Sequence, residues 1–122
     1  MEGFVRRLAI GGAVAALSAS AALASAPPVG RLPHGPTASV YFAVGESYTA
    51  RLPQPKVAGR VWRIARAFNA KVVSETREGE TKQQVWVTFR AAGKGSTRVV
   101  FAITRGETAH AYAAHTFSFK VG

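Results

Sequence analysis

Short runs of alternating apolar and polar residues, separated by turn-forming residues, fill the chain from residue 38 to residue 122. In the clearest run, residues 83–91, one face carries Val85, Val87 and Phe89 and the other face is mostly polar. Alternation with a period of two indicates a β-strand with one buried face. Seven such strands are predicted, at residues 39–44, 47–52, 60–66, 70–77, 83–91, 97–104 and 115–121. No segment has a sustained helical period.

Seven short strands in a region of this length predict an all-β fold, an immunoglobulin-like seven-stranded β-sandwich. A small β-barrel is the alternative. Trp62 lies on the third predicted strand, where it would pack in the core. Trp86 lies on the face opposite Val85, and the pattern leaves open whether its side chain is buried.

The first 37 residues have a different composition from the rest of the chain. Residues 1–26 place Arg6 and Arg7 before an Ala-rich apolar run that closes on Ala24-Ser25-Ala26. This pattern predicts a cleaved signal peptide, and a membrane anchor is the alternative, although glycines and serines interrupt the run. Residues 27–37, rich in proline and glycine, are expected to form a flexible leader. We therefore expect an exported protein, periplasmic or secreted, with no stable membrane insertion after cleavage.

The chain is strongly basic, with 16 Lys and Arg against 6 Asp and Glu. Cleavage after residue 26 would leave 14 cations and 5 anions, a net charge of +9. For an exported protein this charge favours an acidic envelope component over nucleic acid as a partner. A solvated basic surface explains the same charge without any partner, because the cations are scattered singly.

The sequence offers little catalytic chemistry. It contains no cysteine and no aspartate, which excludes a thiol nucleophile and an Asp-based triad or metal cage. His110 and His115 are five residues apart, a spacing that fits no common zinc site. The five glutamates after residue 26 are expected in or beside turns. We therefore predict no catalytic residue, no metal site, no cofactor and no enzymatic activity.

The connections after the second, fourth and sixth strands should meet at one end of such a sandwich. These connections are residues 53–60, 77–82 and 104–111, and they carry the most distinctive loop sequences of the chain. Three loops on a rigid scaffold are a common way to build a binding surface.

From about Val44 to Val121 the sequence resembles the chagasin-like inhibitors of papain-type cysteine proteases. The resemblance rests on VGESYTARLP (44–53), QPKVAGRVW (54–62), VWVTFRAAGKGSTRVVFAITR (85–105) and FSFKV (117–121). It implies a sandwich whose three loops enter the cleft of a papain-like cysteine protease. The residues it assigns to protease binding are Gln54, Pro55, Lys56, Val57, Ala58, Gly59, Gly79, Glu80, Thr81, Arg105, Gly106 and Glu107.

Four of these residues, Pro55, Gly59, Gly79 and Arg105, match the loop motifs of the family. At the third loop, Gly106 and Glu107 replace the family's proline and tryptophan. A competing hypothesis keeps the scaffold without inhibition, as a basic binding or assembly module of the cell envelope.

Overall fold

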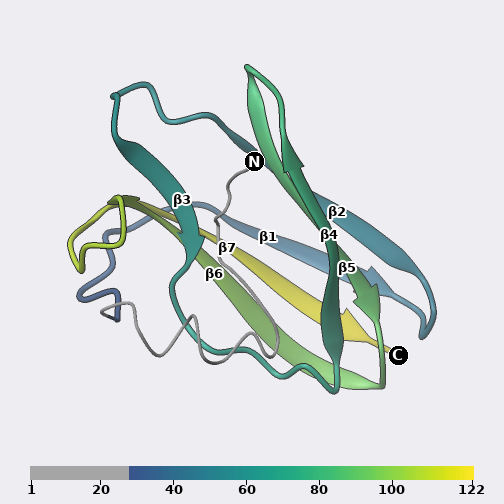
Figure 1. Cartoon of the computed structure of the whole chain (residues 1–122). Coiled ribbons are helices and arrows are strands. Elements are labelled where there is room, and N and C mark those ends of the chain that lie inside the picture. The colour runs from purple at the N-terminus through teal and green to yellow at the C-terminus, as the bar shows by residue number, and fades with distance from the viewer. Residues whose placement is uncertain (1–27) are drawn as a thin grey trace.

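The computed structural model of the chain describes residues 28–122, and the predicted signal peptide lies outside the described residues. The described part of the chain contains seven strands and no helix (Figure 1). The strands are β1 (Thr37–Phe42), β2 (Ser47–Pro53), β3 (Arg60–Ile64), β4 (Val73–Glu80), β5 (Gln84–Ala91), β6 (Gly95–Arg105) and β7 (Ala111–Val121). The predicted all-β sandwich is confirmed.

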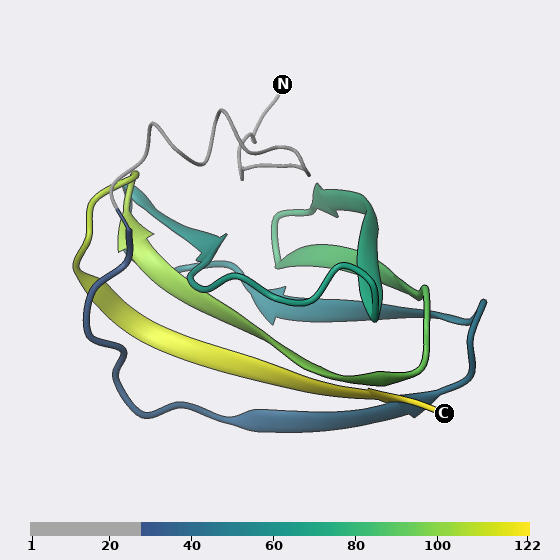
Figure 2. The same ribbon diagram turned by 90° about the horizontal axis from the view of Figure 1, so that it is seen from below.

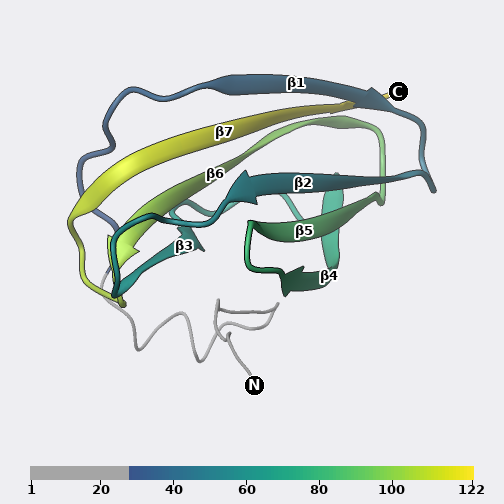
Figure 3. The same cartoon turned by 90° about the horizontal axis from the view of Figure 1, so that it is seen from above.

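The strands form two sheets that pack face to face. One sheet has four strands in the order β1-β7-β6-β3, and the other has three in the order β2-β5-β4. Neighbouring strands are antiparallel except β1 and β7, which are parallel. The four-stranded sheet curves over the three-stranded sheet (Figure 3), and Figure 2 shows the same two layers from below.

Aromatic rings from both sheets fill the space between the layers. Phe89 of the three-stranded sheet lies 5.2 Å from Phe119 and 6.3 Å from Phe101 of the other sheet, measured between ring centroids. Trp62 also joins this core and is only 7% exposed, as its place on β3 predicts. Because no disulfide crosslinks the chain, this core must supply most of its stability.

The largest difference from the predicted strands is at β4. It begins three residues later than predicted and continues through Glu80, so the turn to β5 comprises only residues 81–83. A bulge between Glu75 and Arg77 changes which side chains face inward. Glu75 and Glu78 pair with Phe89 and Val87 of β5 and therefore face the core side of this edge strand. The expectation that these two glutamates lie in turns is wrong.

The segment expected to be a flexible leader makes defined contacts from Val29 onward. Val29 is buried against Ala102 and Ala111 on the outer face of the four-stranded sheet. Both terminal nitrogens of Arg66 donate to this segment, to the carbonyl oxygens of Val29 and Gly30, each at 2.8 Å. Val29 and the two alanines therefore form a small apolar cluster that is separate from the main core.

Candidate binding tip

Three loops meet at one end of the sandwich, at the ends of β2, β4 and β6. They are loop 1 (residues 54–59), loop 2 (residues 81–83) and loop 3 (residues 106–110). Loops 1 and 2 are joined by the Gln54 N–H, which donates to the Gln83 carbonyl oxygen at 3.0 Å. Loops 1 and 3 are joined by the Gly106 N–H, which donates to the Gly59 carbonyl oxygen at 3.2 Å. The predicted clustering of the three loops is therefore present, and we call this surface the tip.

Loop 1 is fastened at its first residues. The Gln54 side-chain amide donates to Glu80 Oε1 and to the Thr81 carbonyl oxygen, both at 2.8 Å. The Trp62 indole N–H donates to the carbonyl oxygen of Pro53 at 2.7 Å, so the core tryptophan also fixes the point where the loop leaves β2. Gly59 ends the loop with φ of +83°, a conformation that favours glycine. Residues 55–58 project between these two anchors.

Loop 3 is held from below by Thr104 and Arg63. Thr104 is fully buried, and its hydroxyl donates to the Gly106 carbonyl oxygen at 2.6 Å. Arg63 donates to the Thr104 hydroxyl at 3.2 Å and to the Thr108 carbonyl oxygen at 2.8 Å. Burial lowers the pKa of Arg63, and the nearby carboxylate of Glu107 opposes this shift. These contacts fix the backbone conformation of loop 3, which contains no proline.

Replacing Thr104 with valine is expected to lower the free energy of unfolding by about 1–3 kcal/mol, because the buried hydroxyl and its two hydrogen bonds are lost. Urea denaturation measures this change. Hydrogen exchange at the Gly106 and Thr108 amides should rise more than exchange at the core strands. Thr108→Val, on the exposed part of the loop, is the control; equal stability of the Thr104 and Thr108 variants would refute the anchor.

The predicted loop 2 residues are divided between the loop and β4. Only Thr81 lies in the turn, where its hydroxyl accepts the N–H groups of Gln83 and Gln84 at 3.2 and 3.1 Å. Glu80 is the last residue of β4 and reaches the tip through its bond to Gln54. Gly79 lies within β4, opposite Trp86 on the outer face. Placing Gly79 in a loop is therefore wrong, and its role is to make room for the half-buried Trp86 ring.

Replacing Gly79 with alanine is expected to destabilise the fold by about 1–3 kcal/mol, because the added methyl group would overlap the Trp86 ring. Thermal or urea unfolding measures the loss. The double variant Gly79→Ala/Trp86→Leu should be less destabilised than the sum of the single variants. Additive losses would contradict this packing.

Apolar side chains are exposed at the tip. Val57 of loop 1 is 50% exposed, Val61 of β3 is 46% exposed and Tyr112 of β7 is 38% exposed. They are three of the five large hydrophobic residues that residues 28–122 expose, the others being Tyr41 and Val44. Exposed apolar side chains in or beside a loop surface are available to contact a partner protein.

An aromatic group that the sequence pattern did not predict lies beside loop 3. The Arg60 guanidinium carbon lies 3.6 Å from the Tyr112 ring centroid, and the His110 ring packs edge to face on the same ring at 4.6 Å. Arg60 also faces Arg105 across β3 and β6. Because Arg60 pairs with Arg105, the last residue before loop 3, the stack lies beside the start of that loop. The alternating pattern could have revealed it, because Tyr112 interrupts a run of alanines.

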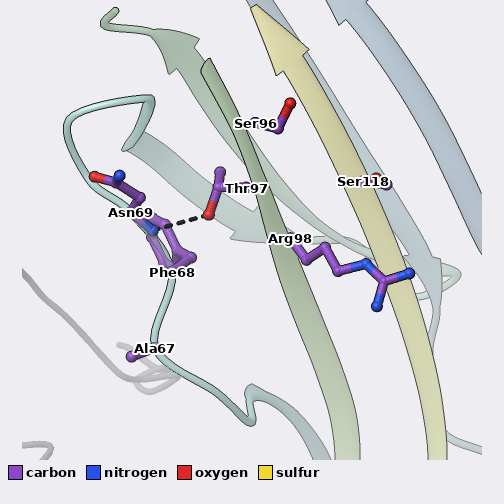
Figure 4. A pocket seen from close by; sticks show the side chains of 7 residues that line it. All are labelled: Ala67, Phe68, Asn69, Ser96, Thr97, Arg98 and Ser118. Carbon is purple, nitrogen blue, oxygen red and sulfur yellow. Dashed lines mark hydrogen bonds between the residues drawn. The ribbon is translucent and has the colours of Figure 1, made fainter. Parts of the chain in front are cut away.

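No group of three or more His, Cys, Asp or Glu side chains in residues 28–122 is placed to bind a metal ion. A shallow depression of about 560 Å³ lies away from the tip, between residues 67–69 and the first part of β6. Figure 4 shows its lining, in which Arg98 is the one charged side chain and the Asn69 N–H donates to the Thr97 hydroxyl at 2.9 Å.

In the part of the chain described, no helix is long and apolar enough to cross a membrane.

The comparisons with known proteins find similarity in the fold but not in the sequence. Neither a protein-family model nor a curated protein matches this chain. Among solved structures, it is similar to the cysteine protease inhibitor EhICP2 from Entamoeba histolytica, with a TM-score of 0.54 and 11% sequence identity. The match covers 74% of this chain and 99% of that inhibitor. The chain therefore has the seven-stranded, immunoglobulin-like sandwich fold of a known cysteine protease inhibitor.

Proposed function

We propose that the protein inhibits papain-like cysteine proteases by inserting the tip into the active-site cleft. One observation carries the proposal: three loops from separate strand pairs are hydrogen-bonded into one surface, on a scaffold similar to that of a cysteine protease inhibitor. The inhibitor would bind as a rigid body, without chemistry of its own.

The tip has the properties that a cleft-binding wedge needs. Pro53 and Pro55 stiffen the start of loop 1, and the anchors at Gln54 and Gly59 limit its motion before binding. Preorganisation of this kind lowers the entropy lost on association. Val57 provides an exposed apolar contact in loop 1, and Tyr112, the second residue of β7, provides an aromatic contact beside loop 3. Aromatic groups of this kind often dominate binding energy, so Tyr112 would partly replace the tryptophan that the family carries at loop 3.

We further propose that the inhibitor is exported through residues 1–26 and acts in the periplasm or outside the cell. The support is the arrangement of Arg6, Arg7 and Ala24-Ser25-Ala26 around an apolar run. Immunoblotting of cell fractions tests export: a shortened protein outside the cytoplasm is expected, and a full-length protein retained in the cytoplasm would contradict it.

Steady-state hydrolysis of a fluorogenic peptide by papain tests the inhibition itself. We expect a competitive inhibition constant below about 1 µM, a free energy of binding beyond about −8 kcal/mol. Trypsin, whose cleft has a different nucleophile and shape, should be unaffected. Unchanged papain activity at tens of micromolar inhibitor, or equal inhibition of both enzymes, would contradict the proposal.

A further inference from the structure

The outer face of the three-stranded sheet is basic and lies outside the tip. Across β2, β5 and β4, Arg51 is in register with Trp86 and Gly79, Arg77 with Thr88, and Arg90 with Ser74. Arg51, Arg77 and Arg90 are exposed. Within the part of the chain that the structure describes, these three guanidinium groups make no ion pair or hydrogen bond. We call Arg51, Arg77, Arg90 and the half-buried Trp86 the Arg–Trp face.

The bulge in β4 gives this face a single sign of charge. With unbroken alternation after Val73, Arg77 would point inward, and Glu78 and Glu80 would point outward beside Arg51. The bulge between Glu75 and Arg77 reverses this order, so that Arg77 pairs with Thr88 on the outer face and Glu78 and Glu80 pair with buried residues of β5. Bulges often redirect side chains at functional positions. As a result, the strands of this face carry three cations and no carboxylate on their outer side.

We propose that the Arg–Trp face binds an acidic polysaccharide, a chain of sugar rings that carries carboxylate or sulfate groups. Strands about 4.8 Å apart, with a rise of about 3.4 Å per residue, separate the three arginine Cα atoms by about 8 to 14 Å. Side chains stand roughly perpendicular to a sheet, so the three guanidinium groups are spread over the face, and a polymer with repeated anionic groups suits this spacing better than a single small anion. Guanidinium groups bind carboxylate and sulfate oxygens through paired hydrogen bonds.

The other side chains of the face also suit a sugar chain. The Trp86 ring presents a flat apolar surface next to Arg51, and the Arg77 guanidinium carbon lies 5.7 Å from its centroid. Thr49 and Thr88 place hydroxyl groups between the arginines, joined to each other at 2.8 Å. A membrane surface fits less well, because none of the exposed large hydrophobic residues of the described chain lies on this face to insert into lipid. The inference is independent of protease binding, since the tip residues do not belong to this face.

The test compares two triple variants with the same net charge. The face variant carries Arg51→Ser, Arg77→Ser and Arg90→Ser. The control variant carries Lys94→Ser, Arg98→Ser and Lys120→Ser, three exposed cations elsewhere on the protein. Binding to polygalacturonate is measured at several salt concentrations, with neutral dextran, single-stranded DNA and phosphatidylglycerol vesicles as alternative ligands.

We expect the face variant to bind polygalacturonate at least tenfold more weakly than wild type, with the slope of log affinity against log salt reduced by about two. The control variant should lose less than threefold. Polygalacturonate should also change the fluorescence of Trp86, which can be assigned with the Trp86→Leu variant because Trp62 is buried. Papain inhibition should be unchanged in the face variant, so the two proposals fail separately.

Three results would overturn the inference: equal losses in both triple variants, which would mean a response to net charge alone; tighter binding to DNA or to vesicles than to polygalacturonate; or no saturable binding of polygalacturonate by the wild-type protein.

Discussion

Rebuilding residues 55–58 as Gly-Ser-Gly-Ser is expected to weaken the inhibition of papain by about 100-fold, the effect of losing one strong contact at the centre of an interface. The change removes Pro55, which stiffens loop 1, and Val57, which is 50% exposed at the tip. The anchors of the loop remain, because Gln54 and Gly59 are unchanged. The inhibition constant of the variant against papain measures the effect.

Val44→Ser is the matched control for this variant. Val44 is also 50% exposed, but it lies in the connection between β1 and β2, at the opposite end of the sandwich. This control should inhibit papain like the wild type. Urea denaturation should show that both variants remain folded, with changes of about 1 kcal/mol or less. A rebuilt loop 1 that inhibits as well as the wild type would remove loop 1 from the binding surface.

The protein is expected to lose stability as the pH rises, and replacing Glu75 with glutamine is expected to remove most of this loss. Burial raises the pKa of Glu75 from 4.5 to about 9, and a hydrogen bond with the Glu78 carboxyl group and the charge of that group add to the shift. The folded protein therefore holds a proton that the unfolded chain releases above about pH 4.5. Stability from this group is fully present below pH 4.5 and is lost as the pH rises to about 9.

The expected slope from Glu75 is up to about 1.4 kcal/mol per pH unit within this window. Urea denaturation at about pH 5, 7 and 9 measures this slope. Glu75→Gln should flatten it, because glutamine has a similar size and can donate a hydrogen bond but does not titrate. Glu107→Gln, which removes an exposed carboxylate of loop 3, should retain the wild-type slope. Equal slopes in the wild type and Glu75→Gln would show that the Glu75 carboxyl group is ionised in the folded protein throughout the range.

The sequence predicts the strands well where apolar and polar residues alternate without interruption. In β5 the alternation of Val85, Val87 and Phe89 gives the correct inward face, and the core position of Trp62 follows from the same reasoning. The prediction fails in β4, because a bulge shifts the alternation by one residue and no local residue type marks its position. The bulge explains why Arg77 faces outward and Glu78 faces the core side. The continuation of β4 through Glu80 explains why Gly79 lies in a strand.

Contacts between distant segments explain the other differences. The segment from Val29 onward was expected to be flexible from its prolines and glycines, yet it packs on outward-facing alanines of β6 and β7. The hydrogen bonds that join the loops of the tip are made by backbone groups of Gln54 and Gly59. Backbone hydrogen bonds between distant loops cannot be predicted from residue types. The clustering of the loops, in contrast, follows from strand order alone and could be predicted.

Hydrogen-exchange footprinting of the protein mixed with papain shows whether the tip binds the protease, because it locates the surface that the protease covers. Slower exchange is expected at the amides of residues 54, 56–59, 81–83 and 106–110, and unchanged exchange at the ends of β1 and β4 that lie farthest from the tip. Absence of protection at the three loops, or protection confined to the Arg–Trp face, would contradict the claim that the tip binds the protease.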